Sequence, residues 1–208
     1  TGHINSMAMQ FFSSPASPFV RKVLVVADET GQLADLDQVR ADPRSLDPAL
    51  VAVNPISKIP ALVTAEGVNL AESDMICMYL DERHSGQKMI PASGPARWQA
   101  LAAEAIADGF MDAAVNRRGE DSRPDGARSQ ADVDKLMGRM MRCMDMMDAQ
   151  AKDAGDTVNI GTIAMAVACG YANFRYPDLD WRTGCPNLAG LYDQMMQRPS
   201  MKATQPDG

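Results

Sequence analysis

The hydrophobic positions of the chain change their spacing near residue 95. Before that point, a short strand-like run that stops at the serine- and proline-rich turn predicts a strand over residues 9–13, and alternating apolar and polar positions predict a second over 36–40. Two further runs, 61–64 and 68–71, flank Glu66-Gly67 and predict a hairpin. Helical spacing and capping signals predict helices over 18–30 and 73–83, and a short helix or turn over 47–53. This alternation of strands and helices indicates a mixed α/β domain.

Beyond the linker at 91–95, marked by proline and glycine, the pattern is helical only. The polar stretch 119–126 separates the first two helices, and the helix over 159–173 is nearly all small and apolar, as expected for a helix buried on every side. The predicted helices cover 96–117, 129–154, 159–173 and 186–197. We therefore expect an α/β domain over 9–88 and an all-α helical bundle over 95–208, with residues 1–8 a vector-derived or disordered start.

Composition excludes several classes of protein. The chain has 208 residues, 46% of them hydrophobic, which is enough for a packed core, and its apolar runs are far shorter than the roughly 20 residues that cross a bilayer. A net charge of −7 argues against a nucleic-acid partner, because binding to phosphates depends on clustered Lys and Arg. The four cysteines form no C-x-x-C pair and only two histidines are present, so no metal site is expected.

The stretch NPISKIPALV places Pro60 at the entrance of a predicted strand. An X-Pro bond can be held in the cis form there, which would turn the main-chain N–H and C=O of Ile59 outward, where an extended peptide could pair with them. The trans form is the commoner one, and the residues alone leave both open.

Two other short stretches allow a binding or a merely structural interpretation. In LAESDM, Glu72 and Ser73 stand at the start of a predicted helix, where free N–H groups and the helix dipole favour a bound carboxylate. The simpler alternative is an N-cap made by Ser73 or Asp74. In SSPASP, Ser17 precedes a helix that begins with proline, so its hydroxyl could stabilise a thiolate there or only cap the helix.

Taken together, these stretches resemble the glutathione transferase superfamily, in its bacterial, serine-dependent, cytosolic form. The resemblance is carried by SSPASPFVRKV, NPISKIPALV, LAESDMICMYLDER and NFRYPDLDWRTGCPNLAGLYDQMMQRPS, in that order, and covers residues 9 to about 201. It implies a thioredoxin-like N-terminal domain, an all-α C-terminal domain, a cytoplasmic homodimer, and reduced glutathione as co-substrate without a metal.

The resemblance also implies roles for individual residues. Pro60 matches the cis-proline of the family, Ile59 would pair with the cysteinyl part of glutathione through its main chain, and Lys58 would reach the glycyl carboxylate. Glu72 and Ser73 would hold the γ-glutamyl end.

The catalytic residue that the resemblance implies is Ser17, with Ser14 as the next candidate. A hydroxyl can donate a hydrogen bond to the glutathione sulfur and lower the pKa of the thiol, whereas a cysteine at this place would form mixed disulfides. No tyrosine lies between residues 9 and 17, so the tyrosine-type mechanism is not expected.

The second domain departs from the family pattern and is the expected site of the electrophile. The family usually opens its buried helix with a Ser/Thr-x-x-Asp capping box, whereas this chain has Asn159 and Thr162, for which we expect a weaker cap. Arg117 and Arg118 could bind an anionic substrate or form a solvated helix end. The candidate electrophile pocket, chosen by shared helical spacing alone, consists of Phe110, Met111, Ala114 and Arg118.

The predicted function is transfer of glutathione to small hydrophobic electrophiles. The alternatives are a binding or regulatory module that keeps the fold without turnover, and glutathione-dependent peroxidase, lyase or isomerase chemistry.

Overall fold

The computed structural model describes residues 8–206. Within them the chain forms two compact units, one of residues 8–88 together with Pro206, the other of residues 89–205. The segment set aside above as a vector-derived start lies outside the described residues, apart from Ala8.

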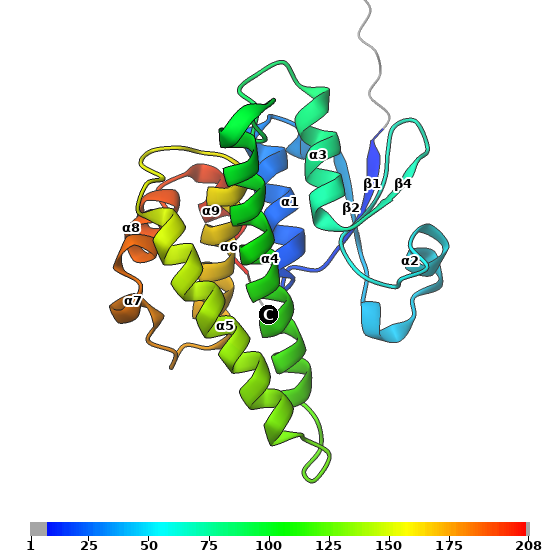
Figure 1. Cartoon of the computed structure of the whole chain (residues 1–208). Coiled ribbons are helices and arrows are strands. Elements are labelled where there is room, and N and C mark those ends of the chain that lie inside the picture. The colour runs from blue at the N-terminus through cyan, green and yellow to red at the C-terminus, as the bar shows by residue number, and fades with distance from the viewer. Residues whose placement is uncertain (1–7, 207–208) are drawn as a thin grey trace, which may run out of the picture. The chain divides into compact units, whose positions relative to one another are not determined.

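A four-stranded sheet forms the centre of the first unit (Figure 1). Its order is β2-β1-β3-β4, with β1 parallel to β2 and antiparallel to β3, and β3 antiparallel to β4. The strands are β1 (Met9–Ser13), β2 (Leu36–Arg40), β3 (Ala61–Val63) and β4 (Asn69–Ala71). The predictions for β1 and β2 are confirmed at both ends, and each hairpin strand is one residue shorter than predicted, because Thr64 and Val68 close the turn by hydrogen bonds to each other.

Three α-helices and two 3₁₀ turns complete this unit: α1 (Pro18–Glu29), η1 (Leu33–Asp35), η2 (Pro43–Ser45), α2 (Pro48–Val53) and α3 (Ser73–Arg83). Helices α1 and α3 pack together on one side of the sheet, and α2 lies on the other (Figure 1). Under α2, Leu50 packs with Phe12, Ala41 and Ala61 in a buried cluster. The thioredoxin-like α/β arrangement predicted for this part is confirmed.

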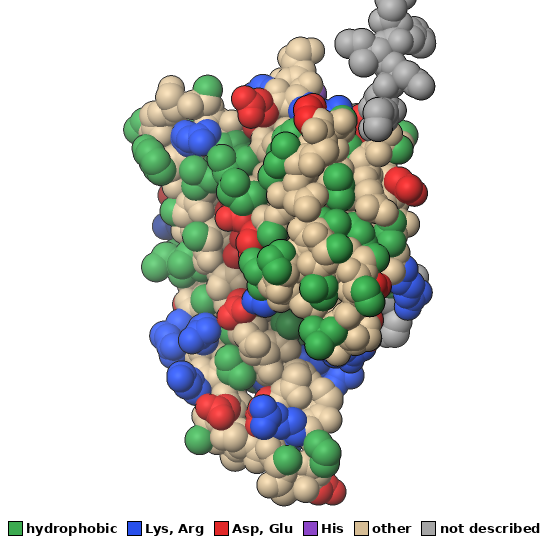
Figure 2. Space-filling view, turned by 90° about the vertical axis from the view of Figure 1, so that its right-hand side faces the viewer, with side chains coloured by type: hydrophobic (Ala, Val, Ile, Leu, Met, Phe, Trp, Pro, Cys, Tyr) green, Lys and Arg blue, Asp and Glu red, His purple; other side chains and the backbone are tan. Residues whose placement is uncertain are grey.

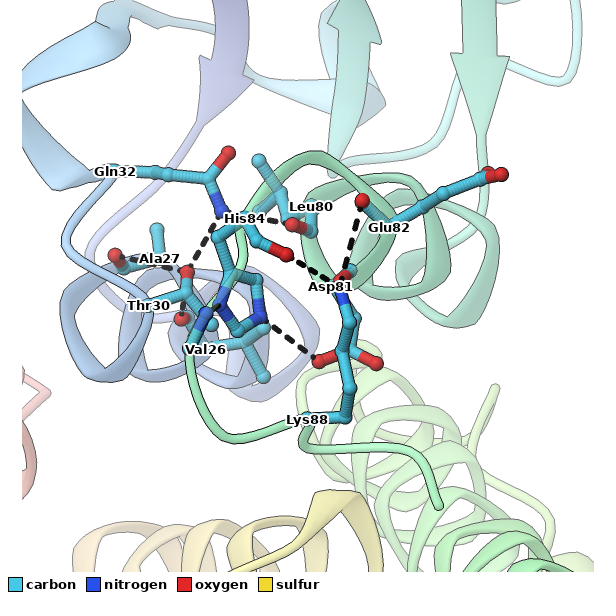
Figure 3. A network of polar contacts seen from close by, with 10 residues as sticks. Val26, Ala27, Thr30, Gln32, Leu80, Asp81, Glu82, His84 and Lys88 are labelled. Carbon is cyan, nitrogen blue, oxygen red and sulfur yellow. Dashed lines mark hydrogen bonds and ion pairs between the residues drawn. The ribbon is translucent and has the colours of Figure 1, made fainter. Parts of the chain in front are cut away.

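The C-terminal ends of α1 and α3 are tied together by polar contacts (Figure 3). Gln32 donates from Nε2 to the Leu80 carbonyl at 2.7 Å and to the Thr30 hydroxyl at 2.9 Å.

The ammonium of Lys88 contacts the carbonyls of Asp81, Glu82 and His84. Because the last carbonyls of a helix have no partner within it, these side chains complete the end of α3 and fix its direction.

The second unit is all-helical, as predicted, with α4 packed against both α5 and α6 (Figure 1). Its helices are α4 (Gly94–Asp121), α5 (Gln130–Ala151), α6 (Ile160–Arg175), α7 (Trp181–Gly184), α8 (Pro186–Met195) and α9 (Pro199–Ala203). Helix α4 is longer than predicted at both ends, and α7 and α9 were not predicted because each spans less than two turns. None of the helices within residues 8–206 is long and apolar enough to cross a bilayer.

Helix α6 is the centre of this unit, and every residue from Ile160 to Ala172 is buried. It begins with a complete capping box, in which Asn159 Oδ1 accepts from the Thr162 amide and Thr162 Oγ1 accepts from the Asn159 amide, both at 3.0 Å. The Thr162 hydroxyl thus accepts the reciprocal hydrogen bond of the capping box, in place of the aspartate expected from the family pattern. At Gly161 a Cβ would lie 2.7 Å from the Ala100 carbonyl, so only glycine permits this approach of α6 to α4.

Candidate functional site

The strand register brings the three predicted motifs to one end of the sheet. Phe12 of β1 is paired with Ala61 of β3, and Ala61 is paired with Ala71 of β4. At this end of the sheet, the next residue is Ser13 in β1, Pro60 just before β3, and Glu72 just after β4. The serine turn, the proline loop and the start of α3 therefore leave the sheet from neighbouring positions, although they are far apart in the sequence.

The serine turn connects β1 to α1. The Ser17 amide donates to the Ser14 carbonyl at 3.1 Å, and Ser17 Oγ accepts from the Val20 amide at 3.3 Å, which makes Ser17 the N-cap of α1. Ser14 and Ser17 are both half-buried. Within residues 8–206 the Ser17 hydroxyl has no acceptor for its own proton, so it caps the helix and can still donate.

The loop before β3 contains a cis peptide bond between Ile59 and Pro60, so the cis form that the resemblance implies is confirmed. Pro60 is buried, Ile59 is half-buried and Lys58 is exposed. No hydrogen bond joins the main chain of Ile59 to another residue of the described part of the chain. An extended ligand would find a free main-chain donor and acceptor there.

Sequence reasoning missed the residue that shapes this loop. Asn54 is 1% exposed; its Nδ2 donates to the Lys58 carbonyl at 2.9 Å and its Oδ1 accepts from the Ile56 amide at 3.1 Å. The Ser57 hydroxyl donates to the Pro43 carbonyl at 3.2 Å, which ties the loop to the segment before α2. The only signal in the sequence is an asparagine at a helix end followed by a proline, which is typical of a turn.

The start of α3 differs from the simple cap considered above. Glu72 is the N-cap residue, with φ of 70° and ψ of 138°, and its side chain makes no capping hydrogen bond. Ser73 is the first helical residue and is buried, and within residues 8–206 the Asp74 carboxylate accepts from the neighbouring Met75 amide alone. A cap by Ser73 or Asp74 is therefore wrong. Among residues 8–206, the exposed Glu72 carboxylate and the amides of Ser73 and Asp74 have no hydrogen-bond partner, so they are left for a ligand.

The candidate electrophile residues lie on α4 and differ sharply in exposure. Phe110, Met111 and Ala114 are each 0% exposed, and Arg118 is exposed. Packing is the role that the structure supports for the three apolar side chains, and their place in a pocket stays a prediction. Among the described residues no group of His, Cys, Asp and Glu side chains is arranged to hold a metal ion.

Comparison with known proteins settles the family. The model of the glutathione S-transferase N-terminal domain matches residues 11–88, and that of the C-terminal domain matches residues 112–194. An uncharacterised GST-like protein of Escherichia coli (strain K12), YibF, is 31% identical over 201 residues, which is 95% of this chain and 98% of that protein. The chain belongs to the glutathione S-transferase family. The resemblance to the glutathione transferase superfamily found in the sequence is thereby confirmed.

Solved structures of glutathione transferases agree over nearly the whole length. A glutathione transferase family member from Pseudomonas fluorescens Pf-5 with bound glutathione is 40% identical and superposes with a TM-score of 0.92, over 96% of this chain and 100% of that chain. A structure from the same organism with bound S-(propanoic acid)-glutathione is 39% identical, with a TM-score of 0.86 and the same coverage.

Proposed function

We propose that the protein is a glutathione transferase that binds reduced glutathione as co-substrate and directs its thiolate at small hydrophobic electrophiles. The observation that carries the proposal is the Ser17 hydroxyl at the N-terminus of α1, which caps the helix and keeps a proton to donate. The Pseudomonas fluorescens relative with bound glutathione, similar over its whole length, supports glutathione as the ligand.

The reaction needs a thiolate near neutral pH, because the thiolate and not the thiol is the nucleophile. An ordinary cysteinyl thiol has a pKa of about 8.5. A hydrogen bond from Ser17, helped by the positive end of the α1 dipole, would lower the pKa of the glutathione thiol. A shift of about two pH units corresponds to roughly 2.7 kcal/mol, which is reasonable for one charge-assisted hydrogen bond and a helix end.

The rest of the site would hold the tripeptide. The main-chain groups of Ile59, which have no hydrogen-bond partner among residues 8–206, would pair with the cysteinyl residue. Lys58 would bind the glycyl carboxylate. Glu72 would face the ammonium of the γ-glutamyl end, and Ser73 with the first amides of α3 would receive its carboxylate.

The acceptor that we propose is a small electrophilic carbon compound. A relative crystallised with S-(propanoic acid)-glutathione supports a small carbon electrophile, because that ligand carries a substituent on the sulfur. We propose addition or substitution at carbon as the reaction, in which the thiolate sulfur forms the new bond to carbon. In an addition the double bond of the acceptor breaks, and its second carbon takes up a proton that replaces the one lost by the thiol. In a substitution the bond to the leaving group breaks, the group departs as an anion with that electron pair, and the proton of the thiol is released to solvent.

We further propose that the protein acts as a homodimer. Met75 and Met78 of α3 are 49% and 42% exposed, and hydrophobic side chains reach the surface at several places on the face shown in Figure 2. Met75 and Met78 are three residues apart on α3 and therefore neighbours on its surface, and contiguous exposed apolar side chains mark contact surfaces. Sedimentation equilibrium of the full chain, with Met75→Lys as the disrupting variant, tests this.

The test of function is the conjugation rate of Ser17→Ala with a small aromatic electrophile. If the thiol pKa returns from about 6.5 to about 8.5, the thiolate fraction at pH 7 falls about 25-fold, and kcat/KM should fall by the same factor. Ser129→Ala is the matched control, because Ser129 caps α5 through a 3.2 Å bond to the Asp132 amide.

The outcomes separate the alternatives. A glutathione-affinity column that retains the protein while no electrophile is turned over would favour the binding module. If Ser17→Ala conjugates as fast as the wild type while Ser14→Ala is slow, then Ser14 is the thiolate stabiliser. Loss of rate in Ser129→Ala as well would mean that the effect comes from stability and not from chemistry.

A further inference from the structure

Asn54 uses both its main chain and its side chain to hold the loop between α2 and β3. It is 1% exposed and stands at the end of α2, where the loop that leads to β3 begins (Figure 1). Its amide donates to the Leu50 carbonyl at 2.7 Å, and its carbonyl accepts from the Ser57 amide at 2.9 Å. With the side-chain bonds to Ile56 and Lys58, the asparagine is fixed to α2 on one side and to the loop on the other.

The bond from Asn54 to the Lys58 carbonyl bears directly on Ile59, because that carbonyl and the Ile59 N–H belong to the same peptide group. Among residues 8–206 the cis peptide is the one between Ile59 and Pro60, so the peptide between Lys58 and Ile59 is trans. In a trans peptide the C=O and the N–H point in opposite directions. By holding the carbonyl, Asn54 turns the Ile59 N–H away from itself and from the end of α2.

No other hydrogen bond within residues 8–206 holds this peptide group. The Ile59 amide has no acceptor there, and the Lys58 carbonyl has no donor besides Asn54. Asn54 therefore sets the direction of a donor that is free to bind a ligand. A hydrogen bond weakens steeply as its angle departs from linear, so a rotation of this peptide would weaken the bond to that ligand.

We propose that Asn54 is a positioning residue for glutathione: by holding the Lys58 carbonyl, it presents the Ile59 N–H to the cysteinyl carbonyl of the tripeptide. This role rests on the proposed function, in which the main chain of Ile59 pairs with the cysteinyl residue. The loop is held before the ligand arrives, so less ordering entropy opposes binding. The donor on the carbonyl also polarises the peptide, which strengthens the hydrogen bond that its N–H makes.

The two side-chain bonds of Asn54 can be removed separately, which distinguishes positioning from a general role in the fold. Asn54→Asp keeps an oxygen that accepts from the Ile56 amide and loses the donor to the Lys58 carbonyl. Asn54→Ala loses both bonds and adds no charge. Asn173→Asp is the matched control, because it adds the same charge on α6 and keeps the oxygen that accepts from Trp181 Nε1 at 2.9 Å.

The test is titration of the full-length protein with reduced glutathione by calorimetry, together with conjugation kinetics. Asn54→Asp and Asn54→Ala should each raise the Kd for glutathione about 10-fold, and Asn173→Asp should leave it unchanged. The kcat at saturating glutathione should stay within about 2-fold of the wild type, because Ser17 is untouched and the loss is one of binding. Hydrogen exchange of the Ile59 amide, followed by NMR, should slow when glutathione binds to the wild type.

An unchanged Kd in Asn54→Asp would overturn the role of the donor. So would a Kd that rises in Asn54→Asp and not in Asn54→Ala, which would point to charge alone, or a fall in kcat as large as the rise in Kd, which would point to general damage. If both variants fail to fold, the wild type decides: an Ile59 amide that exchanges equally fast with and without saturating glutathione contradicts the proposal. A wild type that binds no glutathione overturns the proposed function itself, and that result is distinct from binding that the variants leave intact.

Discussion

Ser17 Oγ accepts a hydrogen bond from the Val20 amide at 3.3 Å, so one hydroxyl serves both the fold and the proposed chemistry. Its lone pair satisfies one of the free amides at the start of α1, and its proton remains available. The two roles can be separated, because capping changes stability and proton donation changes the bound thiol.

Loss of the cap should lower stability modestly. Ser17→Ala is expected to reduce the free energy of unfolding by about 0.5–2 kcal/mol, and Ser129→Ala, which removes a cap of the same kind, by a similar amount. Urea unfolding of both variants measures this. A loss several times larger for Ser17→Ala would show that its side chain has structural contacts beyond the cap.

Glu72 is expected to reduce stability in favour of binding. At φ of 70° a residue with a Cβ costs of order 1–3 kcal/mol, and glycine relieves most of this. Glu72→Gly should therefore be more stable than Glu72→Ala, while both raise the KM for glutathione equally through loss of the carboxylate. Thermal unfolding of the two variants measures their stability, and steady-state kinetics measure their KM for glutathione. A glycine variant no more stable than the alanine variant would contradict the strain at this position.

Gly161 and Gly190 should respond in opposite ways to alanine. A Cβ at Gly161 would lie 2.7 Å from the Ala100 carbonyl and 2.8 Å from the Ala103 Cβ, and overpacking of this kind typically costs about 1–3 kcal/mol. At Gly190, inside α8, a Cβ meets nothing within 4 Å, so alanine should stabilise the helix by about 0.5–1 kcal/mol. Urea denaturation of Gly161→Ala and Gly190→Ala gives the change in the free energy of unfolding of each variant relative to the wild type. Equal changes in the two variants would contradict the close approach of α6 to α4.

Tyr176 should make the unfolding free energy depend on alkaline pH. Burial, and secondarily the neighbouring Tyr171, raise the pKa of Tyr176 to about 12, above the value of about 10 in the unfolded chain. Its contribution is complete below about pH 10 and is lost as the pH rises through about 12, because the unfolded state releases the proton first. The difference in the free energy of unfolding between the wild type and Tyr176→Phe should thus narrow from about pH 10 to about pH 12. A difference that stays constant over this range would contradict the raised pKa of Tyr176.

The sequence predicted the elements of the fold because their signals are local. Ser17 followed by Pro18 marks the start of α1, and Gly31, with φ of 71°, marks its end. The short run that ends at the serine- and proline-rich turn defined β1, and the alternation of polar and apolar residues defined β2, both to the residue.

The details of the site were less predictable because they depend on contacts between distant segments. The positive φ of Glu72 carries no local signal, since glutamate is rarely found in that conformation. The role of Asn54 could not be predicted because it depends on a hydrogen bond to the Lys58 carbonyl, which only the folded loop brings close. The exposure of Arg118 and the burial of Phe110 on the same helix are set by packing against other helices, which helical spacing alone could not assign.

The most direct test of the account is the pKa of the glutathione thiol in the complex, followed by the ultraviolet absorbance of the thiolate across pH. In the wild type it should lie well below the value of about 8.5 for an ordinary thiol, by about two pH units, and Ser17→Ala should bring it back close to that value. A thiol pKa that is the same in both proteins would contradict the role of Ser17.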